Sequence, residues 1–413
     1  MDLIVRNARL LDRDGAWEIG VEDGRIAAID RGIEATAESE IDAAGNLAAP
    51  TYVNGHVHLD KCNLGDVMRP NLTNSFQECL EITWEHKRTY TVDDIVERAS
   101  RAIEEGILNG STVFRVFADV DSIGGLRPLE GIIALREKYA GIVEIEAVDF
   151  PQEAIVRDPG TDELMEEGMR MGADVVGGLP WHEHLDEDAR AHIDFCFELA
   201  KKYDKDIHML VDDTDNANSR SLEYLAARTI REGYQGRVSA SHCGALAAYD
   251  EVHAHKVMNL VRDAGVSISS NPQISLVAQG RYDTNNMRRG VTRTKDLWKI
   301  GANVFASQDD VNDPYYPFGR NDQQEVAAHV CHACHMTYPD EIRAVFDFIT
   351  GNAAKAMRLE GYGLDVGTKA DFNVLAAPTV QHVLRLQQPP PWVIKRGRVL
   401  ARNELARERI GGG

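Results

Sequence analysis

Strand-like and helix-like stretches alternate through the middle of the chain. Short runs rich in Val, Ile and Phe predict strands at residues 45–54, 112–119, 142–150, 173–180, 206–213, 237–242, 266–272 and 303–310. Amphipathic stretches such as residues 91–108 and 162–172 lie between them and predict helices. This alternation is typical of parallel strands joined by right-handed crossovers. Eight such units predict an α/β fold, a (β/α)8 TIM barrel.

The two chain ends show a different pattern. Residues 2–12 and 17–30, and residues 370–377 and 391–402, read as short alternating strands with Asp-Gly or Arg-Gly turns. We therefore predict one small split β-sandwich domain built from residues 1–50 and 361–413. The barrel, residues 51–360, is inserted between its two parts.

Composition and charge limit the partners of the chain. The 413 residues are 43% hydrophobic, which allows a large core. Lys and Arg number 45 and Asp and Glu number 66, so the net charge of −21 argues against nucleic acid and anionic membranes as partners. The N-terminal residues do not read as a signal peptide, and no apolar run predicts a membrane helix. We expect a cytoplasmic protein.

The six cysteines read as reduced thiols, but "CHACH" at residues 331–335 matches the haem-attachment pattern C-x-x-C-H. That attachment requires export, and the surrounding residues 321–338 have helical periodicity. A helix that places Val326, Val330 and Cys334 on one face is the simpler interpretation. A zinc knuckle is disfavoured because no second Cys/His pair lies nearby at finger spacing.

The stretch "GHVHLD", residues 55–60, carries the first candidate chemistry. Side chains alternate along a strand, so His56 and His58 point to the same side, as two ligands of one metal would. Chemistry in such a barrel lies at the C-terminal ends of the strands. Three of the other predicted strands end on polar residues: Asp213 on the fifth, His242 on the sixth, and Asp309 and Asp310 on the eighth. Nitrogen and oxygen donors of this kind suit Zn²⁺, Fe²⁺ or Mn²⁺.

Each of these residues also has a structural interpretation. A histidine on a strand is usually a satisfied polar group, and an acidic residue at a strand end often caps the next helix. The group is more informative than its members, because four strand ends converge on one mouth. We therefore predict a metal site there.

Several stretches resemble one family. They are "HVHLD" (56–60), "DFPQEAI" (149–155), "GADVVGGLP" (172–180), "DDTDNANSR" (212–220), "SASHC" (239–243), "QGRYDTNNMRRGVTR" (279–293) and "DDVNDPYYPFG" (309–319). Together with the order of the strand-end residues and the split terminal domain, they resemble the amidohydrolase superfamily. Within it, the bacterial cytosine deaminase group is the most similar, over nearly the whole chain.

The resemblance implies roles for the metal-site residues. His56, His58 and Asp309 match metal ligands, and Asp309 would also take a proton from the metal-bound water. His242 matches the histidine that holds or polarises this water, and it could serve as a fourth ligand.

The resemblance also implies substrate-binding residues. Gln152 matches the glutamine that bonds the ring amide of the substrate. Asp310 matches the second acid of the strand-eight pair, which lines the same pocket. Lys61 is more similar to the N-isopropylammelide isopropylaminohydrolase branch than to cytosine deaminase.

The sequence departs from the family pattern at strand five. Counting back from "NSR" places Leu210 where the family has its third histidine ligand, and Asp213 where it has its acid–base glutamate. His208 lies two residues earlier, about 6 to 7 Å deeper on the same strand face, and would reach the metal only after a bulge or register shift. Phe117 and Gln308 also replace histidines of the family. The pocket has become more apolar.

These observations predict a metal-dependent hydrolase, an aminohydrolase or deaminase with one divalent metal (Zn, Fe or Mn). A metal-activated hydroxide would attack a carbon–nitrogen bond of a small nitrogen heterocycle, while Asp213 passes a proton to the departing nitrogen. Two alternatives stay open: a ring-opening cyclic amidohydrolase with the same site, and a non-catalytic barrel that has lost its activity. The resemblance also implies a homo-oligomer.

Overall fold

The computed structural model describes residues 1–73, 75–285 and 288–406. They form two compact units. One unit contains Met1–Thr51, Ile107–Thr112 and the described residues from Glu360 onward, and the other contains Tyr52–Gly106 and Val113–Leu359. The division into independent domains at residues 50 and 360 stays a prediction, because a compact unit does not by itself show which segments fold alone.

The terminal unit is built on a mixed sheet. Its strands are β1 (Leu3–Leu10), β2 (Arg13–Glu22), β3 (Arg25–Asp30), β4 (Ser39–Asp42), β5 (Leu47–Pro50), β14 (Phe372–Val374), β15 (Trp392–Lys395) and β16 (Arg398–Arg402). Across the sheet they lie in the order β16-β15-β14-β5-β1-β2-β3, and β4 pairs with β1. Both predicted turns close hairpins with left-handed residue pairs, Asp23 and Gly24 (φ 50° and 71°) and Arg396 and Gly397 (φ 50° and 74°). The unit also contains helix α14 (Val380–Leu386).

The second unit is the predicted parallel barrel. Its strands are β6 (Tyr52–His58), β7 (Ser111–Asp119), β8 (Glu144–Phe150), β9 (Val175–Val176), β10 (Asp206–Val211), β11 (Val238–His242), β12 (Ser267–Ser270) and β13 (Val304–Ala306), each beside the next. The ring closes between its first and last members: the backbone N–H of His58 donates to Asp309 O and that of Asp309 donates to His56 O, both at 2.9 Å. This closure brings the residues after β13 against the histidines of β6.

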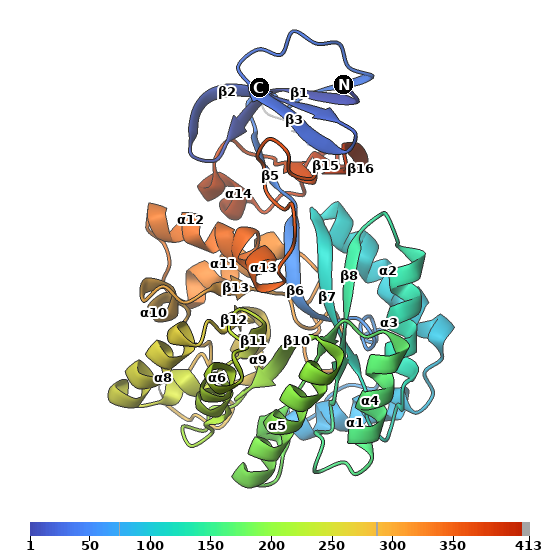
Figure 1. The fold of residues 1–413 in the computed structure, drawn as a ribbon, viewed down its shortest axis with the longest axis vertical. Helices are drawn as coiled ribbons and strands as arrows, with labels where there is room; N and C mark the ends of the chain where they lie inside the picture. Colours follow the sequence, from blue (N-terminus) through green and yellow to red (C-terminus); the bar gives the residue numbers. More distant parts are fainter. Residues whose placement is uncertain (74, 286–287, 407–413) are drawn as a thin grey trace, which may run out of the picture. The chain divides into compact units, whose positions relative to one another are not determined.

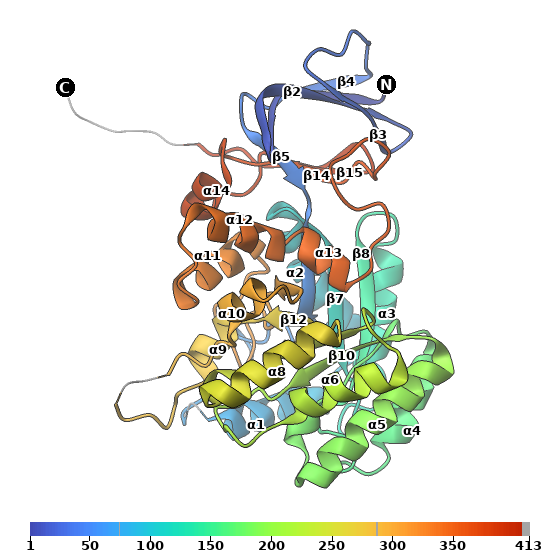
Figure 2. The same ribbon diagram turned by 60° about the vertical axis from the view of Figure 1, so that its left-hand side comes forward.

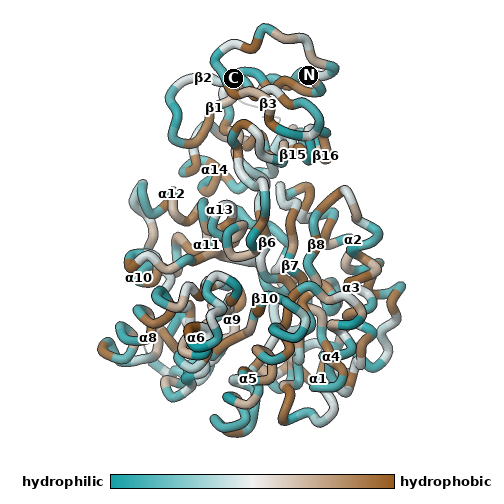
Figure 3. Tube along the Cα trace, in the orientation of Figure 1, coloured by the Kyte–Doolittle hydropathy of each residue, from teal (hydrophilic) through white to brown (hydrophobic). Residues whose placement is uncertain are grey.

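Helices follow most of the barrel strands. They are α1 (Phe76–Lys87), α2 (Val92–Leu108), α3 (Arg127–Lys138), α4 (Thr161–Met171), the 3₁₀ helix η1 (Pro180–His182), α5 (Asp186–Tyr203), α6 (Ser221–Glu232), α7 (Ala245–Ala248), α8 (Glu251–Asp263), α9 (Pro272–Ala278), α10 (Thr294–Lys299), α11 (Gln323–Ala333), α12 (Pro339–Phe348) and α13 (Gly351–Ala356). Figures 1 and 2 show the helices, among them α3, α5 and α8, on the outside of the strands. Hydrophobic and hydrophilic positions alternate along them (Figure 3), as expected when one side of a helix packs on a sheet.

The predicted strand at residues 45–54 is wrong in one respect. The chain forms two strands there, β5 in the terminal sheet and β6 in the barrel, separated by Thr51. Pro50 ends β5, and proline has no N–H with which to continue a ladder. One apolar run in the sequence therefore serves two sheets.

The predicted strand at residues 173–180 is also shorter in the structure, where β9 holds two residues. Gly177 follows it, and a Cβ at this glycine would lie 2.5 Å from the backbone oxygen of Asp149. The close approach of the two backbones requires glycine here, and Pro180 then begins η1.

The region around "CHACH" is helical, as predicted. Cys331 lies in α11, Cys334 caps its C-terminus, and Val326 and Val330 are completely buried. None of the helices in the described part of the chain is both long and apolar enough to span a membrane.

Candidate metal-dependent active site

The strand-end residues predicted from the sequence meet at the mouth of the barrel. His56 and His58 belong to β6, His242 is the last residue of β11, and Asp309 follows β13. Each of the four is at most 3% exposed. Polar groups are costly to bury without partners, so their convergence indicates a functional site.

Three of these side chains place their donor atoms in a small triangle. The Nε2 atoms of His56 and His58 are 3.3 Å apart, and Asp309 Oδ1 lies 2.9 Å from the first and 3.4 Å from the second. Ligand atoms at about 2.0–2.1 Å from a tetrahedral metal are separated from one another by about 3.3 Å. The residues present therefore fit a divalent metal ion.

His242 lies beside this triangle. Its Nε2 is 3.6 Å from Asp309 Oδ2 and its Nδ1 is 3.4 Å from Asp213 Oδ1. Burial lowers the pKa of His242, but the carboxylates of Asp213 and Asp309 outweigh it and raise this pKa to about 9. Donor atoms of His56, His242 and Asp309 all lie within 4.8 Å of one another, so His242 can also contribute to a metal site.

The backbone at this mouth is strained. His242 and Asp309 adopt left-handed conformations, with φ of 66° and 71°. Such residues cost on the order of 1–3 kcal/mol each and are concentrated at functional sites. Gly55 allows the Phe305 ring to pack closely against β6, because a Cβ at this position would lie 2.7 Å from that ring. Both left-handed residues therefore belong to the cluster of donor atoms at the mouth.

A polar chain supports His56 from below. Ser241 Oγ lies 2.6 Å from His56 Nδ1 and also 2.6 Å from His208 Nε2. The Nδ1 atom of His208 in turn faces the Arg115 guanidinium at 3.5 Å. If His56 donates its Nδ1 proton to Ser241, its Nε2 is free to bind a metal.

His208 lies below the mouth of the barrel and contacts Ser241. The pairing of β10 with β11 is regular from Ile207 to Val211, so no register shift moves His208 toward the mouth. Its Nε2 is directed to Ser241, and the groups of potential ligands among the described residues do not include it. Leu210, one step nearer the mouth on the same face, lines the pocket instead.

Asp213 is held by the stretch that follows α9. Gln279 Nε2 donates to Asp213 Oδ1 at 2.7 Å, and the backbone N–H of Gly280 donates to Asp215 at 2.6 Å. Both donors belong to the "QGRY" part of the sequence. The long string that resembled the family thus fixes the carboxylate beside His242.

Sequence reasoning missed a network of buried charges next to the pocket. Lys61 Nζ donates to Asp119 Oδ1 at 2.6 Å, and Lys87 Nζ contacts Asp119 Oδ2 at 2.5 Å and Asp121 Oδ2 at 2.7 Å. Burial raises the pKa of Asp119, but the two ammonium groups outweigh this effect and lower it. Asp119 was detectable in principle, because it ends a predicted strand, whereas Lys87 lies on α1 and gives no such signal.

Asp310 faces a second acid that was also missed. Burial, together with the nearby Asp313 and Asp309, raises the pKa of Asp310 well above its ordinary value. Asp313 accepts the backbone N–H groups of Tyr315 and Tyr316 at 2.9 and 3.0 Å. Asp310 lines the pocket, and Asp313 is not among the described residues that line it.

The pocket above the triangle contains about 450 Å³ of empty space, its open mouth included. It brings together His58, His242, Asp213, Asp309, Asp310, Lys61 and Gln152. Phe117 lies behind it and stacks on the ring of His56, with centroids 4.0 Å apart and planes at 18°. Leu179, Leu210 and Trp181 add apolar lining. The mixed polar and apolar walls suit a small flat ring.

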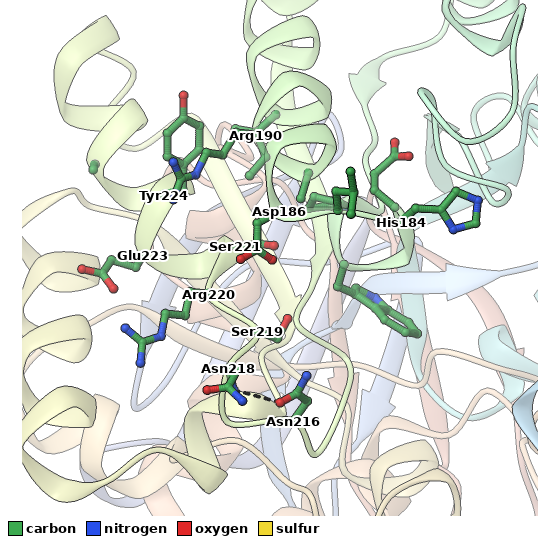
Figure 4. A pocket seen from close by; sticks show the side chains of 17 residues that line it. His184, Asp186, Arg190, Asn216, Asn218, Ser219, Arg220, Ser221, Glu223 and Tyr224 are labelled. Atoms are coloured by element: carbon green, nitrogen blue, oxygen red, sulfur yellow. Dashed lines mark hydrogen bonds between the residues drawn. The ribbon is translucent and has the colours of Figure 1, made fainter.

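A wider groove lies beyond Trp181, between the segments that precede α5 and α6 (Figure 4). Polar side chains such as Arg190, Asn218 and Glu223 line it, and Asn218 N–H donates to Asn216 Oδ1 at 2.9 Å. Of the described lining residues, Trp181 alone belongs to both depressions. The predicted site residues all lie in or beneath the smaller pocket.

Known proteins share this architecture. The amidohydrolase family model matches residues 91–401. The chain is 28% identical to N-isopropylammelide isopropyl amidohydrolase of Pseudomonas sp. strain ADP, over 98% of each chain.

Two solved structures are similar over almost their whole length. The 5-methylcytosine deaminase from Klebsiella pneumoniae, liganded with phosphonocytosine, is 31% identical with a TM-score of 0.94, over 98% of this chain and 100% of that one. N-isopropylammelide isopropylaminohydrolase from Burkholderia multivorans is 26% identical with a TM-score of 0.86, over 98% and 99% of the two chains. Together with the family match, these similarities show that the chain belongs to the amidohydrolase family, whose members are hydrolases of carbon–nitrogen bonds and generally bind a divalent metal ion.

Proposed function

We propose that this chain is a metal-dependent aminohydrolase that removes an amine or ammonia from a carbon of a small nitrogen heterocycle. The observation that carries the proposal is the triangle of donor atoms from His56, His58 and Asp309 at the floor of the pocket. Relatives named for ammelide and cytosine chemistry support this substrate class.

One divalent ion, Zn²⁺, Fe²⁺ or Mn²⁺, would be held by His56, His58 and Asp309, with His242 as a fourth ligand or as its neighbour. Such an ion supplies Lewis-acid activation of water at neutral pH. Three imidazoles and one carboxylate suit each of these metals.

The protons would be handled by the buried acids. Asp309 would accept a proton from the attacking water, and Asp213 would deliver one to the departing nitrogen. Asp213 is suited to this step because Gln279 fixes its Oδ1 at 2.7 Å and His242 lies 3.4 Å from the same oxygen. His242 would orient the water through the nitrogen that faces Asp309.

The ring would be held by Gln152, Lys61 and Asp310, which line the pocket. Its faces would rest against Leu210 and Trp181. The loss of the two family histidines at Leu210 and Phe117 makes room for apolar contact, so we propose a ring with an apolar substituent or one that sits deeper than cytosine. A homo-oligomeric state stays a prediction from the family resemblance.

Expression with supplemented Zn²⁺, Fe²⁺ or Mn²⁺, followed by metal analysis and a screen of nitrogen heterocycles, tests this proposal. We expect close to one equivalent of metal, and release of ammonia or amine from at least one aminated ring. Ring absorbance recorded in parallel detects ring opening, the alternative outcome at the same site. Less than about a tenth of an equivalent of any metal, with no turnover of any ring, would support a non-catalytic barrel instead.

A further inference from the structure

The "CHACH" motif places two thiols on the last turn of α11. Cys331 lies in the helix, Cys334 is its C-cap residue, and both are only partly buried, whereas the other four cysteines are buried. From helix geometry, residues three apart have Cα atoms about 5 Å apart and are neighbours on the helix surface. Cys331 and Cys334 therefore form a pair of neighbouring thiols that solvent can reach.

The backbone holds this turn in a defined shape. The Cys334 N–H donates to Val330 O at 2.9 Å, and the Met336 N–H donates to Cys331 O at 3.0 Å. His335, between the two donors, is left-handed with φ of 53°. A bond that spans a left-handed residue in this way is typical of the Schellman motif at a helix end. The spacing of the two cysteines is thus fixed by the end of α11.

A cation lies beside the pair. α10 is next to this end of α11 (Figures 1 and 2), and its Lys295 Nζ donates to His335 O at 2.8 Å and pairs with Glu341 at 2.6 Å. Burial raises the pKa of Cys334 to about 11, although the Thr294 hydroxyl and the Lys295 ammonium group oppose this shift. Lys295 therefore favours negative charge on the cysteine pair.

Two common fates of a cysteine pair fit this turn poorly. Zinc takes four ligands, and the groups of potential metal ligands found among the described residues include neither cysteine. A disulfide requires Cβ atoms about 3.5–4.5 Å apart, whereas positions three apart on a helix have them about 5–6 Å apart. Burial, Cys334 and Glu341 also raise the pKa of Cys331 to about 11, and a protonated thiol is a poor nucleophile in disulfide exchange.

We infer that Cys331 and Cys334 form a two-thiolate site for a soft, two-coordinate metal ion of the Cu⁺ type. With metal–sulfur bonds of about 2.3 Å, an ion between two sulfur atoms separates them by about 4.6 Å, which suits the helical spacing better than a direct S–S bond. Thiolates are the ligands that Cu⁺ prefers. Each thiol releases its proton to solvent on binding, so the bound pair carries one net negative charge, beside Lys295. The site is separate from the barrel mouth and does not depend on the proposed function.

Anaerobic titration with Cu⁺ in competition with a copper(I) chelator tests the site. Zn²⁺ is added first, to fill the proposed site at the barrel mouth, and we expect one further equivalent of tightly bound Cu⁺. Cys331→Ser and Cys334→Ser should each weaken Cu⁺ binding at least about a hundredfold, because each removes one of only two ligands. Cys196→Ser is the matched control, since this thiol is fully buried in α5 and serine can still donate to Gly177 O. Its Cu⁺ affinity should stay within about threefold of wild type.

X-ray absorption at the copper edge of the wild type identifies the ligand atoms without any variant, and two sulfur atoms are expected. Nitrogen ligands, or no tight binding of Cu⁺, would overturn the site. So would tight Cu⁺ binding that survives in the double variant Cys331→Ser/Cys334→Ser, or an equal loss in Cys196→Ser. A second equivalent of Zn²⁺ that the double variant loses would overturn the preference for Cu⁺. The heterocycle screen decides the proposed function separately, because none of these variants changes the barrel mouth.

Discussion

The mouth of the barrel divides into two sectors of different chemistry. The ligand sector, named for the proposed metal ligands, consists of His56, His58, His242 and Asp309, from β6, β11 and the segment that follows β13. The apolar sector consists of Phe117, Phe150, Leu179 and Leu210, from the strands β7 to β10 and the turn before η1, and it belongs to one buried cluster. The sectors meet where Phe117 stacks on His56.

The two sectors contribute differently to the stability of the protein. The ligand sector carries buried polar groups and left-handed backbone at His242 and Asp309, which are unfavourable for stability. The apolar sector gains stability from burial, and it holds Phe117 and Leu210 where the resemblance implies histidines. Under the proposed function, the ligand sector would carry the chemistry and the apolar sector would contact the substrate ring.

The largest expected effect comes from removing a ligand. His58→Ala should lose its metal and at least about a hundredfold of its activity, since even residues behind a ligand can be worth 10–100-fold. Metal analysis and turnover of the substrate found in the screen measure both. His208→Ala is the matched control and should keep most of its metal. If His208→Ala lost its metal and His58→Ala kept it, the ligand sector would have been assigned to the wrong residues.

Ser241→Ala should have the next largest effect. Its hydroxyl lies 2.6 Å from His56 Nδ1, so its loss frees the tautomer and orientation of that ring. We expect metal affinity to fall about 10- to 100-fold with the fold intact, measured by competition with a chelator. Ser269→Ala removes a buried hydroxyl on β12 that contacts Ser307 at 3.3 Å, and it should leave metal affinity within about threefold. Equal losses in both variants would mean that Ser241 acts only through packing.

The smallest effect is expected when Leu210 and Asp213 are changed back toward the family pattern. Leu210→His combined with Asp213→Glu should bind metal about tenfold more tightly and gain measurable cytosine deamination. Phe117 and Gln308 remain, so the gain should be partial, and activity on the natural ring should fall. The two single variants are the controls. A double variant that loses activity without binding metal more tightly would show that Leu210 is not the vacated ligand position.

Much of this site could be predicted from local sequence. The spacing of His56 and His58 places both on one face of a strand, and the alternation of strands and helices places other strand ends at the same mouth. The departures at Leu210 and Phe117 were also visible, because counting back from "NSR" located Leu210 and the strand "VFAD" could be compared directly with the family pattern. Local rules were less successful at residues 45–54, where Pro50 ends one strand and the next begins in another sheet.

The sequence by itself determined the parallel barrel, the terminal β-structure and the convergence of His56, His58, His242 and Asp309 at one mouth, because strand periodicity and strand ends are local properties. Tertiary structure alone decided which groups support them. Ser241 links His56 to His208, Gln279 holds Asp213, and Lys87 shares Asp119 with Lys61. These contacts join segments far apart in the chain, and their geometry depends on barrel closure and side-chain packing, which no local pattern encodes.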